Sequence, residues 1–386
     1  MSDCKDRCRG DGHWLSCARV ALRRRGSIRR CGAMAIVASI TLGGCSTAPL
    51  LPYTAETPPL VMVPASKAGV QDKRGRFREI FCQVLETRGA ALPDYRPCDE
   101  ALTRVGVEPG GTGGKVELGP SKRRLIAALV PGFGWDCFSD WLQPTDTVGT
   151  HLRRIGYDLI VLKVDSLSSS GSNARQIRDA IMQMPPHETG SRLVLIGYSK
   201  GAPDILEAAT SYPEIRARVA AVVSAGGAVG GSPLANEAEQ SHLALFRNWP
   251  GAQCSPGDGG AIDSLRPGTR RTWLARHPLP RGLPYYSLVT FPQPERISRV
   301  LTLGYNKLSQ VDARNDGQIL FYDQVIPEST LVGYVNADHW ALAVPVGRTH
   351  RLLGTTFVDQ NAYPREALLE ALLRFVEEDV AAPGVR

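Results

Sequence analysis

The sequence predicts an α/β protein built on a doubly wound, mostly parallel sheet, with a cap insertion and a small helical N-terminal appendage. Short apolar runs without an alternating polar face are typical of central parallel strands, which are covered on both faces. From residue 122 onward these runs alternate with segments of helical composition, which is the pattern of a parallel α/β sheet. The alternation stops between residues 231 and 283, and this interruption indicates the insertion.

The basic charge of the chain is concentrated at its start. The chain has 386 residues and a formal net charge of +7. Residues 1–44 hold nine Lys or Arg and three Asp, a charge of +6, so the remainder carries only about +1. Because the basicity belongs to the leader, it does not indicate a nucleic-acid surface, and we expect no nucleic-acid partner.

The leader has the pattern of an export signal. Five arginines between residues 23 and 30 precede an apolar run at 33–42, which is too short to span a bilayer and suits a signal peptide. The run ends in Leu42-Gly43-Gly44-Cys45, which resembles the lipobox of bacterial lipoproteins. This resemblance implies removal of residues 1–44 and a lipid anchor on Cys45 in the cell envelope. An ordinary cleaved signal and a short membrane anchor are the alternatives.

The residue after the lipobox cysteine indicates which membrane of the cell envelope the protein is sent to. Ser46 stands where the lipoprotein pattern uses aspartate to retain a protein at the inner membrane. For a Gram-negative source, the resemblance therefore implies the outer membrane, facing the periplasm or the exterior.

Three short segments precede the predicted catalytic domain. Residues 45–71 are rich in proline and form the expected tether. Residues 72–108 show helical periodicity, with a turn at Pro93-Asp94 and a second short helix near 98–105. We expect a packed helical appendage there, with a docking surface as the alternative. Residues 109–121 are rich in glycine and are expected to form a flexible linker.

Four cysteines remain after Cys45. An even number in an exported chain predicts disulfides, and four cysteines allow three pairings. We favour one bond that joins the two short helices and a second that joins the cap to the first strand's loop. No C-x-x-C motif occurs, so neither a metal site nor a cofactor is expected. The favoured pairs are Cys82 with Cys98 and Cys137 with Cys254.

The catalytic domain is expected to cover residues 122–386. The insertion at 231–283 is rich in Gly, Pro and Arg, and we expect it to overhang the site as a cap. A long loop without substrate contact is the alternative. The expected strands are 125–130, 157–164, 193–196, 219–223, 285–290 and 330–335, and the expected helices lie near 138–154, 173–183, 202–211, 295–309 and 364–378.

Ser199 has the sequence context of a nucleophile. It lies in Gly197-Tyr198-Ser199-Lys200-Gly201, between an apolar run and a helical segment. A serine on such a tight turn takes a strained backbone conformation, and the residues two before and two after it must lack a Cβ. The turn also directs the amide of Lys200 toward the position where an oxyanion would form.

A serine hydroxyl needs a neighbouring base to become nucleophilic at neutral pH. His339 follows the last predicted strand, at the sheet edge where the carboxyl ends of parallel strands meet and where Ser199 is expected. His350 is the alternative, although it stands between two arginines.

The base in turn needs a carboxylate to orient it. Asp316 is the first choice, because Asn315-Asp316-Gly317 is a turn signal before an apolar run. Asp312 and Asp323 are the competitors, and Asp338 is adjacent to His339 in the sequence. The order serine, aspartate, histidine is that of hydrolases with a G-x-S-x-G turn.

The motifs GYSKG, NDG and DH, with PGFG after the first strand, resemble serine hydrolases of the α/β-hydrolase superfamily. The acid lies about two dozen residues before the histidine, which is similar to bacterial lipases and esterases. The resemblance covers residues 122–378. It implies that Ser199 is the nucleophile, His339 the base, Asp316 its partner, and the amides of Phe133 and Lys200 the oxyanion hole. Pro131-Gly132 stands where lipases usually carry His-Gly.

The resemblance implies hydrolysis of carboxylic esters through an acyl-enzyme, on a protein tethered to a membrane. A thioesterase or an acyltransferase would use the same triad. A lipoprotein that keeps the fold as an inert scaffold is the alternative from another class, and such a scaffold has no chemical reason to keep serine, acid and histidine together.

Overall fold

The computed structural model describes residues 69–123, 125–138, 147–185, 190–238 and 252–381. The predicted signal peptide, the predicted lipidation site Cys45 and most of the proline-rich tether lie outside the described residues.

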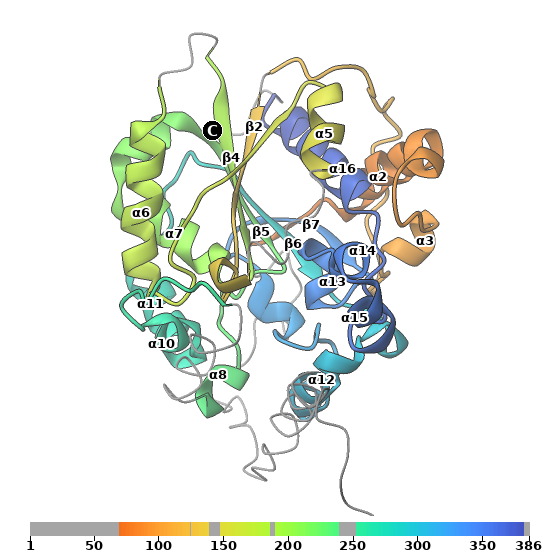
Figure 1. The fold of residues 1–386 in the computed structure, drawn as a ribbon. Coiled ribbons are helices and arrows are strands. Elements are labelled where there is room, and N and C mark those ends of the chain that lie inside the picture. Colours follow the sequence, from red (N-terminus) through yellow and green to blue (C-terminus); the bar gives the residue numbers. More distant parts are fainter. Residues whose placement is uncertain (1–68, 124, 139–146, 186–189, 239–251, 382–386) are drawn as a thin grey trace, which may run out of the picture. The chain divides into compact units, whose positions relative to one another are not determined.

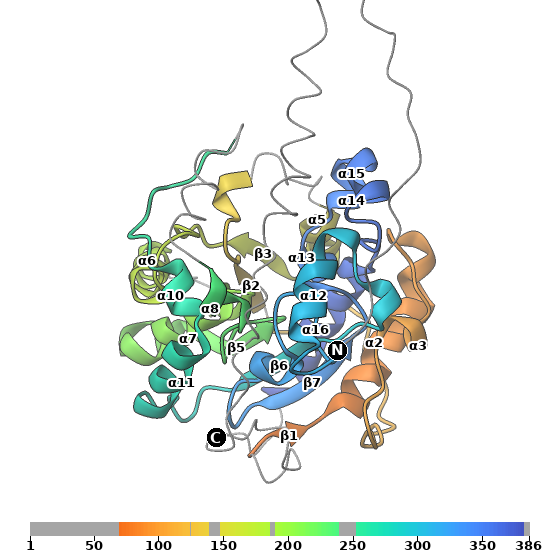
Figure 2. The ribbon, with the colours of Figure 1, turned by 90° about the horizontal axis from the view of Figure 1, so that it is seen from below.

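Seven strands form one sheet in which every neighbouring pair is parallel. The order is β1-β7-β6-β5-β4-β2-β3, so β1 and β3 are the edges (Figure 2). The predicted fold class is confirmed. The strands are β1 (Gln71–Asp72), β2 (Leu125–Val130), β3 (Asp158–Val161), β4 (Arg192–Tyr198), β5 (Val219–Ala225), β6 (Tyr285–Thr290) and β7 (Thr330–Val335).

Helices cover both faces of the sheet (Figure 1). One face is covered by α6 (Ser170–Gln183), α7 (Gly201–Ser211) and α11 (Pro267–Arg276), and the other by α2 (Arg74–Arg88), α5 (Thr147–Arg154) and α16 (Arg365–Asp379). Each face buries its own apolar core. The short helices are α3 (Cys98–Ala101), α8 (Leu234–Glu237), α10 (Ala261–Leu265), α12 (Thr302–Leu308), α13 (His339–Ala343), α14 (Val346–Thr349) and α15 (Arg351–Thr356).

The segment expected as an appendage shares the sheet and the core of the catalytic domain. β1 pairs with β7, and Phe77 of α2 is fully buried against Phe375 of α16. The predicted disulfide between Cys82 and Cys98 joins α2 to α3. The second helix ends before residue 105, because Leu102 forms an antiparallel bridge with β7. We therefore place the start of the folded unit near residue 70.

The glycine-rich segment after it is held in place rather than flexible. The carboxylate of Glu79 accepts hydrogen bonds from the amides of Thr112 (3.1 Å) and Gly113 (2.9 Å). A Cβ at Gly111 would lie 1.8 Å from the Glu79 Oε1 atom, so a larger residue would require the Glu79 side chain to move. The expected flexible linker is corrected: its first half is bonded along α2.

Only part of the predicted cap lies near the carboxyl ends of the strands. α11 packs on the sheet face beside α7, and its Trp273 contacts the apolar core of that face. It is thus the crossover helix between β5 and β6, which corrects the predicted extent of the cap. The part of the predicted cap that precedes α11 contains Cys254. The predicted disulfide between Cys137 and Cys254 joins this part to the loop after β2.

The helix predicted at 295–309 is broken. Two 3₁₀ turns, Pro294–Arg296 and Arg299–Leu301, precede α12. Between them Ser298 is extended, with φ −61° and ψ 145°. Its amide donates a hydrogen bond to the Asp338 carboxylate at 2.9 Å. The Asp338 side chain therefore accepts the hydrogen bond from the Ser298 amide, which in a continuous helix would bond a backbone carbonyl.

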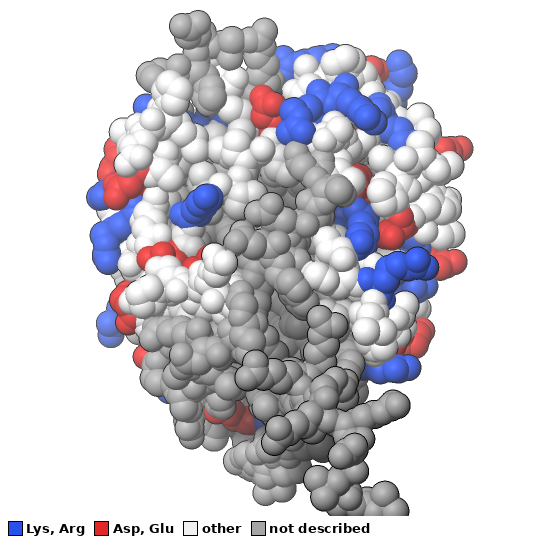
Figure 3. Space-filling model, viewed as in Figure 1, with Lys and Arg blue, Asp and Glu red and all other residues white. Residues whose placement is uncertain are grey.

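Acidic and basic side chains both occur across the described surface in Figure 3. Among the described residues, no helix combines the length and the apolar character that crossing a membrane requires.

Candidate active site

Ser199 sits on a strained turn between β4 and α7. Its φ is +56°, a left-handed conformation that is uncommon for a residue other than glycine. A Cβ at Gly201 would lie 2.1 Å from the Val130 carbonyl oxygen, and one at Gly197 would lie 2.5 Å from the Ala202 nitrogen. Both glycines are therefore required by close backbone approach, as the sequence motif indicates.

The surrounding backbone fixes this turn. The carbonyl of Ser199 accepts hydrogen bonds from the amides of Ala202 (3.1 Å) and Ala228 (2.9 Å). A Cβ at Gly132 would lie 2.6 Å from the Cβ of Ser199, so the loop after β2 touches the serine directly. The strained conformation is thus held from both neighbouring strands.

His339 bridges Ser199 and Asp316. Its Nε2 lies 2.9 Å from the Ser199 Oγ, and its Nδ1 lies 2.8 Å from the Asp316 Oδ2. The histidine is the first residue of α13, directly beyond β7, and it is 4% exposed. Its amide donates to the Asp316 carbonyl oxygen at 3.0 Å. The structure thus brings together the three side chains singled out in the sequence.

The competing residues lie elsewhere. Asp312 forms an ion pair with Arg314, and His350 stands at the junction of α14 and α15. Asp323 belongs to the 3₁₀ turn Phe321–Gln324, and its carbonyl oxygen accepts the amide of Gly230 at 2.7 Å.

The Asp316 carboxylate is fully buried and receives five hydrogen bonds. The amides of Gln318 (2.9 Å) and Ile319 (2.8 Å) donate to Oδ1. The Thr290 hydroxyl and the Gln324 side-chain amide donate to Oδ2, beside His339. Donors on both oxygens fix the plane of this carboxylate. Thr290 and Gln324 were missed from the sequence, where neither stands in a motif.

Asp338 has a different environment, although it is also buried. Its Oδ1 accepts from the amide of Ala341 at 2.7 Å and caps α13, while its Oδ2 accepts from the amide of Ser298. Burial raises the pKa of this carboxyl above its ordinary value. Both oxygens are occupied by backbone amides, so Asp338 places the helix that carries His339.

Tyr198, the residue before the serine, contacts His339 directly. Its hydroxyl donates to the His339 carbonyl oxygen at 2.7 Å, and the two rings stack with centroids 5.1 Å apart. Burial raises the pKa of this phenol well above its ordinary value, so it remains a donor. Nothing in the sequence indicated this contact.

The two residues expected to supply oxyanion donors flank the serine. Lys200 begins the turn into α7, where helix amides point toward the N-terminus. Phe133 follows Gly132 and packs partly buried beside the Cys137–Cys254 disulfide. An anion that forms at the serine would therefore meet the positive end of an eleven-residue helix.

A largely apolar cavity of about 770 Å³ begins beside the serine turn. Pro131 and Trp135 of the loop after β2 line it, as does Tyr198. Leu342, one turn beyond His339, forms another part of the wall, and leucines of α16 continue it. This volume lies within the range of ligand cavities in proteins.

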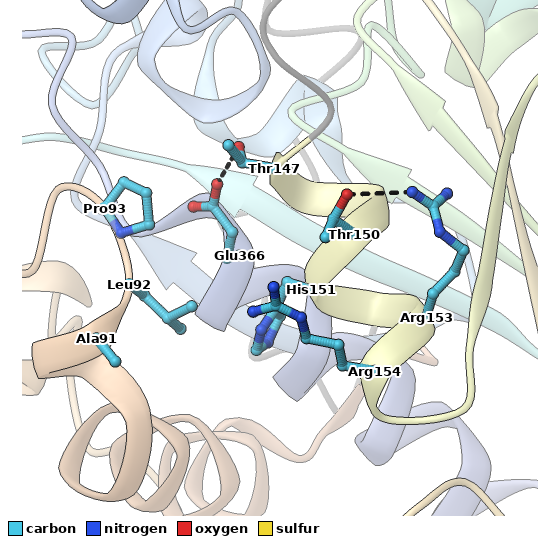
Figure 4. A pocket seen from close by; sticks show the side chains of 9 residues that line it. All are labelled: Ala91, Leu92, Pro93, Thr147, Thr150, His151, Arg153, Arg154 and Glu366. Atoms are coloured by element: carbon cyan, nitrogen blue, oxygen red, sulfur yellow. Dashed lines mark hydrogen bonds between the residues drawn. The ribbon is translucent and has the colours of Figure 1, made fainter.

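A smaller hollow of about 400 Å³ lies between α5, α16 and the loop at 91–93 (Figure 4). Several of its polar groups are already paired: Thr147 donates to Glu366 at 2.6 Å, and Arg153 donates to Thr150 at 3.1 Å. His151 lies 2.6 Å from the buried carboxylate of Glu370. The Thr147–Glu366 and His151–Glu370 pairs join α5 to α16. Among the described residues, no group of three or more His, Cys, Asp or Glu is arranged to hold a metal ion.

Comparison with known proteins identifies the family of the chain. The structure of a metagenomic carboxyl esterase, MGS0156, is 41% identical and matches 84% of this chain and 97% of its own, with a TM-score of 0.77. The chain belongs to this family of carboxyl esterases, with the α/β-hydrolase fold.

More distant structures also match. A Bacillus licheniformis lipase, BlEst2, in its mature form is 20% identical over 59% of this chain and 89% of its own, with a TM-score of 0.47. A Staphylococcus hyicus lipase is 12% identical over 70% of this chain and all of its own (100%), also with a TM-score of 0.47. No protein-family model and no curated protein matches the chain.

Proposed function

We propose that this esterase hydrolyses carboxylic esters with Ser199 as nucleophile, His339 as general base and acid, and Asp316 as the orienting acid. The observation that carries the proposal is the bridge made by His339, whose two ring nitrogens lie 2.9 Å from the Ser199 Oγ and 2.8 Å from the Asp316 Oδ2. Nucleophile, base and carboxylate in hydrogen-bond contact form the arrangement that acyl transfer requires.

In the first half of the reaction, Ser199 Oγ attacks the ester carbonyl carbon while His339 Nε2 takes the hydroxyl proton. The negative charge moves to the carbonyl oxygen, which the amides of Lys200 and Phe133 stabilise. The carbon–oxygen bond to the leaving group then breaks. The proton on Nε2 passes to the departing alkoxide, leaving an acyl-enzyme and a free alcohol.

In the second half, a water molecule attacks the acyl carbon and gives its proton to His339. Collapse of the tetrahedral intermediate releases the carboxylic acid and returns the proton to Ser199. Throughout, Asp316 accepts the Nδ1–H bond, which keeps Nε2 free of hydrogen in the resting state and stabilises the imidazolium when it forms.

The cavity beside the elbow supports an apolar acyl group as the part of the substrate that the protein encloses. It borders Tyr198 and Pro131, the chain neighbours of Ser199 and Gly132, and its wall continues along Leu368 and Leu372 of α16. An apolar chain gains about 0.8 kcal/mol for each buried methylene. We expect kcat/KM to rise with acyl length from two carbons, and a series of p-nitrophenyl esters measures this.

Fluorophosphonate labelling of the mature protein tests the proposed nucleophile. Wild type should be labelled, and Ser199→Ala should lose labelling together with roughly 10⁶-fold in kcat. Ser211→Ala is the matched control, because Ser211 is exposed at the other end of the same helix. Equal labelling of wild type and Ser199→Ala, or no labelling of folded wild type, would contradict the proposal.

We also propose that a lipid on Cys45 tethers the enzyme to the cell envelope, probed by feeding cells a clickable fatty acid. The support is the apolar run that ends in Leu42-Gly43-Gly44-Cys45. The full chain should incorporate the label, and Cys45→Ala should lose it and leave the membrane fraction. Incorporation that persists in Cys45→Ala would rule out this site.

A further inference from the structure

Lys200, the residue after the serine, carries a fully buried ammonium group. Its Nζ lies 2.9 Å from each carboxylate oxygen of Asp204, one turn further along α7. Both side chains are 1% exposed. Asn173 of α6, also fully buried, donates its side-chain amide to the Asp204 Oδ2 at 2.7 Å. A charged lysine is thus enclosed directly beneath the turn that presents Ser199.

Stability alone does not account for this pair. Removing two charges from water is costly, and apolar side chains of similar volume often stabilise a core as well or better. The surroundings add to the cost, because three nearby buried polar atoms have no hydrogen-bond partner within the described structure. These atoms are Asn173 Oδ1, Ser170 Oγ on α6, and Nη2 of Arg270, whose charge acts on Asp204. Polar groups retained at such a cost indicate a role beyond packing.

The pair contacts the residue whose amide is the expected oxyanion donor. The backbone changes from a left-handed conformation at Ser199, with φ +56°, to a right-handed helical conformation at Lys200, with φ −58°. The peptide between these residues carries the Lys200 N–H. Asp204 holds Lys200 at two points, since its carboxylate binds the ammonium and its amide donates to the Lys200 carbonyl oxygen at 3.3 Å. A lysine side chain fixed at its far end also restricts its own backbone.

We propose that the buried network of Lys200, Asp204 and Asn173 positions the Lys200 amide for the oxyanion. The three are positioning residues: their side chains act through the peptide and do not contact the substrate. This inference rests on the proposed function, because it requires an oxyanion at Ser199. A donor that acts only in the transition state changes kcat and leaves KM unaltered.

The test compares charge removal with charge imbalance. Lys200→Met leaves the Asp204 carboxylate buried and unpaired, so it should lower both the melting temperature and kcat. The double variant Lys200→Met/Asp204→Leu removes both charges and should recover most of the melting temperature. Its kcat should remain about 10- to 100-fold below wild type at unchanged KM, a smaller loss than deletion of an oxyanion donor.

Two further variants separate positioning from loss of stability. Ile205→Val, at a fully buried residue of the same helix, should lower the melting temperature and leave kcat unchanged. Asn173→Ala leaves Lys200 paired with Asp204 and removes only the amide bond to the Asp204 carboxylate. It should lower kcat by roughly threefold. If neither lysine variant folds, the kcat of Asn173→Ala tests whether the network positions the Lys200 amide.

Wild-type kcat in the folded double variant, or in Asn173→Ala when the lysine variants do not fold, would overturn the inference. A proportional loss of kcat in Ile205→Val would also overturn it, since kcat would then follow stability. A folded wild type that is neither labelled by fluorophosphonate nor active on any ester would instead overturn the proposed function itself.

Discussion

Two buried aspartates lie next to His339, one in the loop that follows α12 and one at the start of α13. Asp316 is 23 residues away in the sequence and contacts the ring, whereas the carboxylate of Asp338, the adjacent residue, accepts hydrogen bonds from the amides of Ser298 and Ala341. The side chains that surround Asp316 supply donors to the oxygen that faces the histidine. The comparison shows that the direction of a carboxylate, set by its donors, decides which aspartate can orient the base.

The largest effect is expected from Asp316→Asn. An amide cannot accept at both positions that the carboxylate occupies, and the histidine is then held in the wrong tautomer, for which a loss of about 10⁴-fold in kcat is typical. Steady-state kinetics on a p-nitrophenyl ester measures it. Asp312→Asn is the control, because Asp312 pairs with Arg314 in the same segment. A loss below tenfold would assign the orienting role to another residue.

A smaller effect is expected from Thr290→Val. This change removes the hydroxyl that donates to the Asp316 Oδ2 and keeps the shape of the side chain. A hydrogen bond to a charged group contributes about 1.5–3 kcal/mol, so we expect kcat to fall by about 10- to 100-fold. Thr330→Val makes the same chemical change at the start of β7 and should leave kcat near wild type. Equal losses of kcat in both variants would show that the loss follows from removing any buried threonine hydroxyl and not from the bond to Asp316.

Asp338→Asn should reduce kcat by less than tenfold while it lowers the melting temperature. The amide nitrogen would face the Ser298 or the Ala341 amide, so one donor loses its acceptor, at a cost of about 1–3 kcal/mol. Kinetics and thermal unfolding measure the two effects. A loss as large as that of Asp316→Asn would erase the distinction between the two aspartates.

The pH dependence of stability should sharpen this distinction. Because burial raises the folded-state pKa of Asp338, the folded protein binds this proton more tightly than the unfolded chain does. The stability of wild type relative to Asp338→Asn should therefore increase as pH falls through the raised pKa, down to the ordinary carboxyl value of about 3.9. Denaturant titrations of both proteins across this range provide the measurement. A difference that stays constant or shrinks would contradict the raised pKa.

The smallest effect is expected from Tyr198→Phe. The variant loses the hydroxyl bond to the His339 carbonyl oxygen and keeps the stacked ring. We expect roughly a fivefold loss of kcat, because a bond to a neutral acceptor contributes about 1 kcal/mol. Tyr286→Phe removes a buried hydroxyl that bonds Asp379, away from the serine, and serves as the control. A change in KM alone would place Tyr198 in substrate binding instead.

Much of the fold could be predicted because the strands that form its centre are continuous apolar runs. The expected strands at 125–130, 285–290 and 330–335 match the structure residue for residue. The elbow could be recognised because its steric demands leave a local signature in two glycines. These features depend on neighbours in the sequence, so the sequence reports them.

The features that were missed depend on distant partners. β1 is only two residues long, and its pairing with β7 has no local signal. The break at Ser298 arises from a carboxylate forty residues away. Thr290 and Gln324 support Asp316 across separate strands and turns, and Lys200 resembles any surface lysine until Asp204 and Asn173 enclose it. Side-chain hydrogen bonds over long separations are not encoded in periodicity.

The pairing of β1 with β7 has a consequence for the order of folding. Gln71 and Asp72, near the start of the described residues, find their strand partners at Thr330 and Leu331. Lys73 forms an ion pair with Asp379, near the end of the last helix. Closing a loop of this length carries an entropic cost that contacts must offset, which makes the step late and slow. Nascent chains that lack α16 should therefore leave α2 without its partner, exposed to chaperones and proteases until α16 has been synthesised.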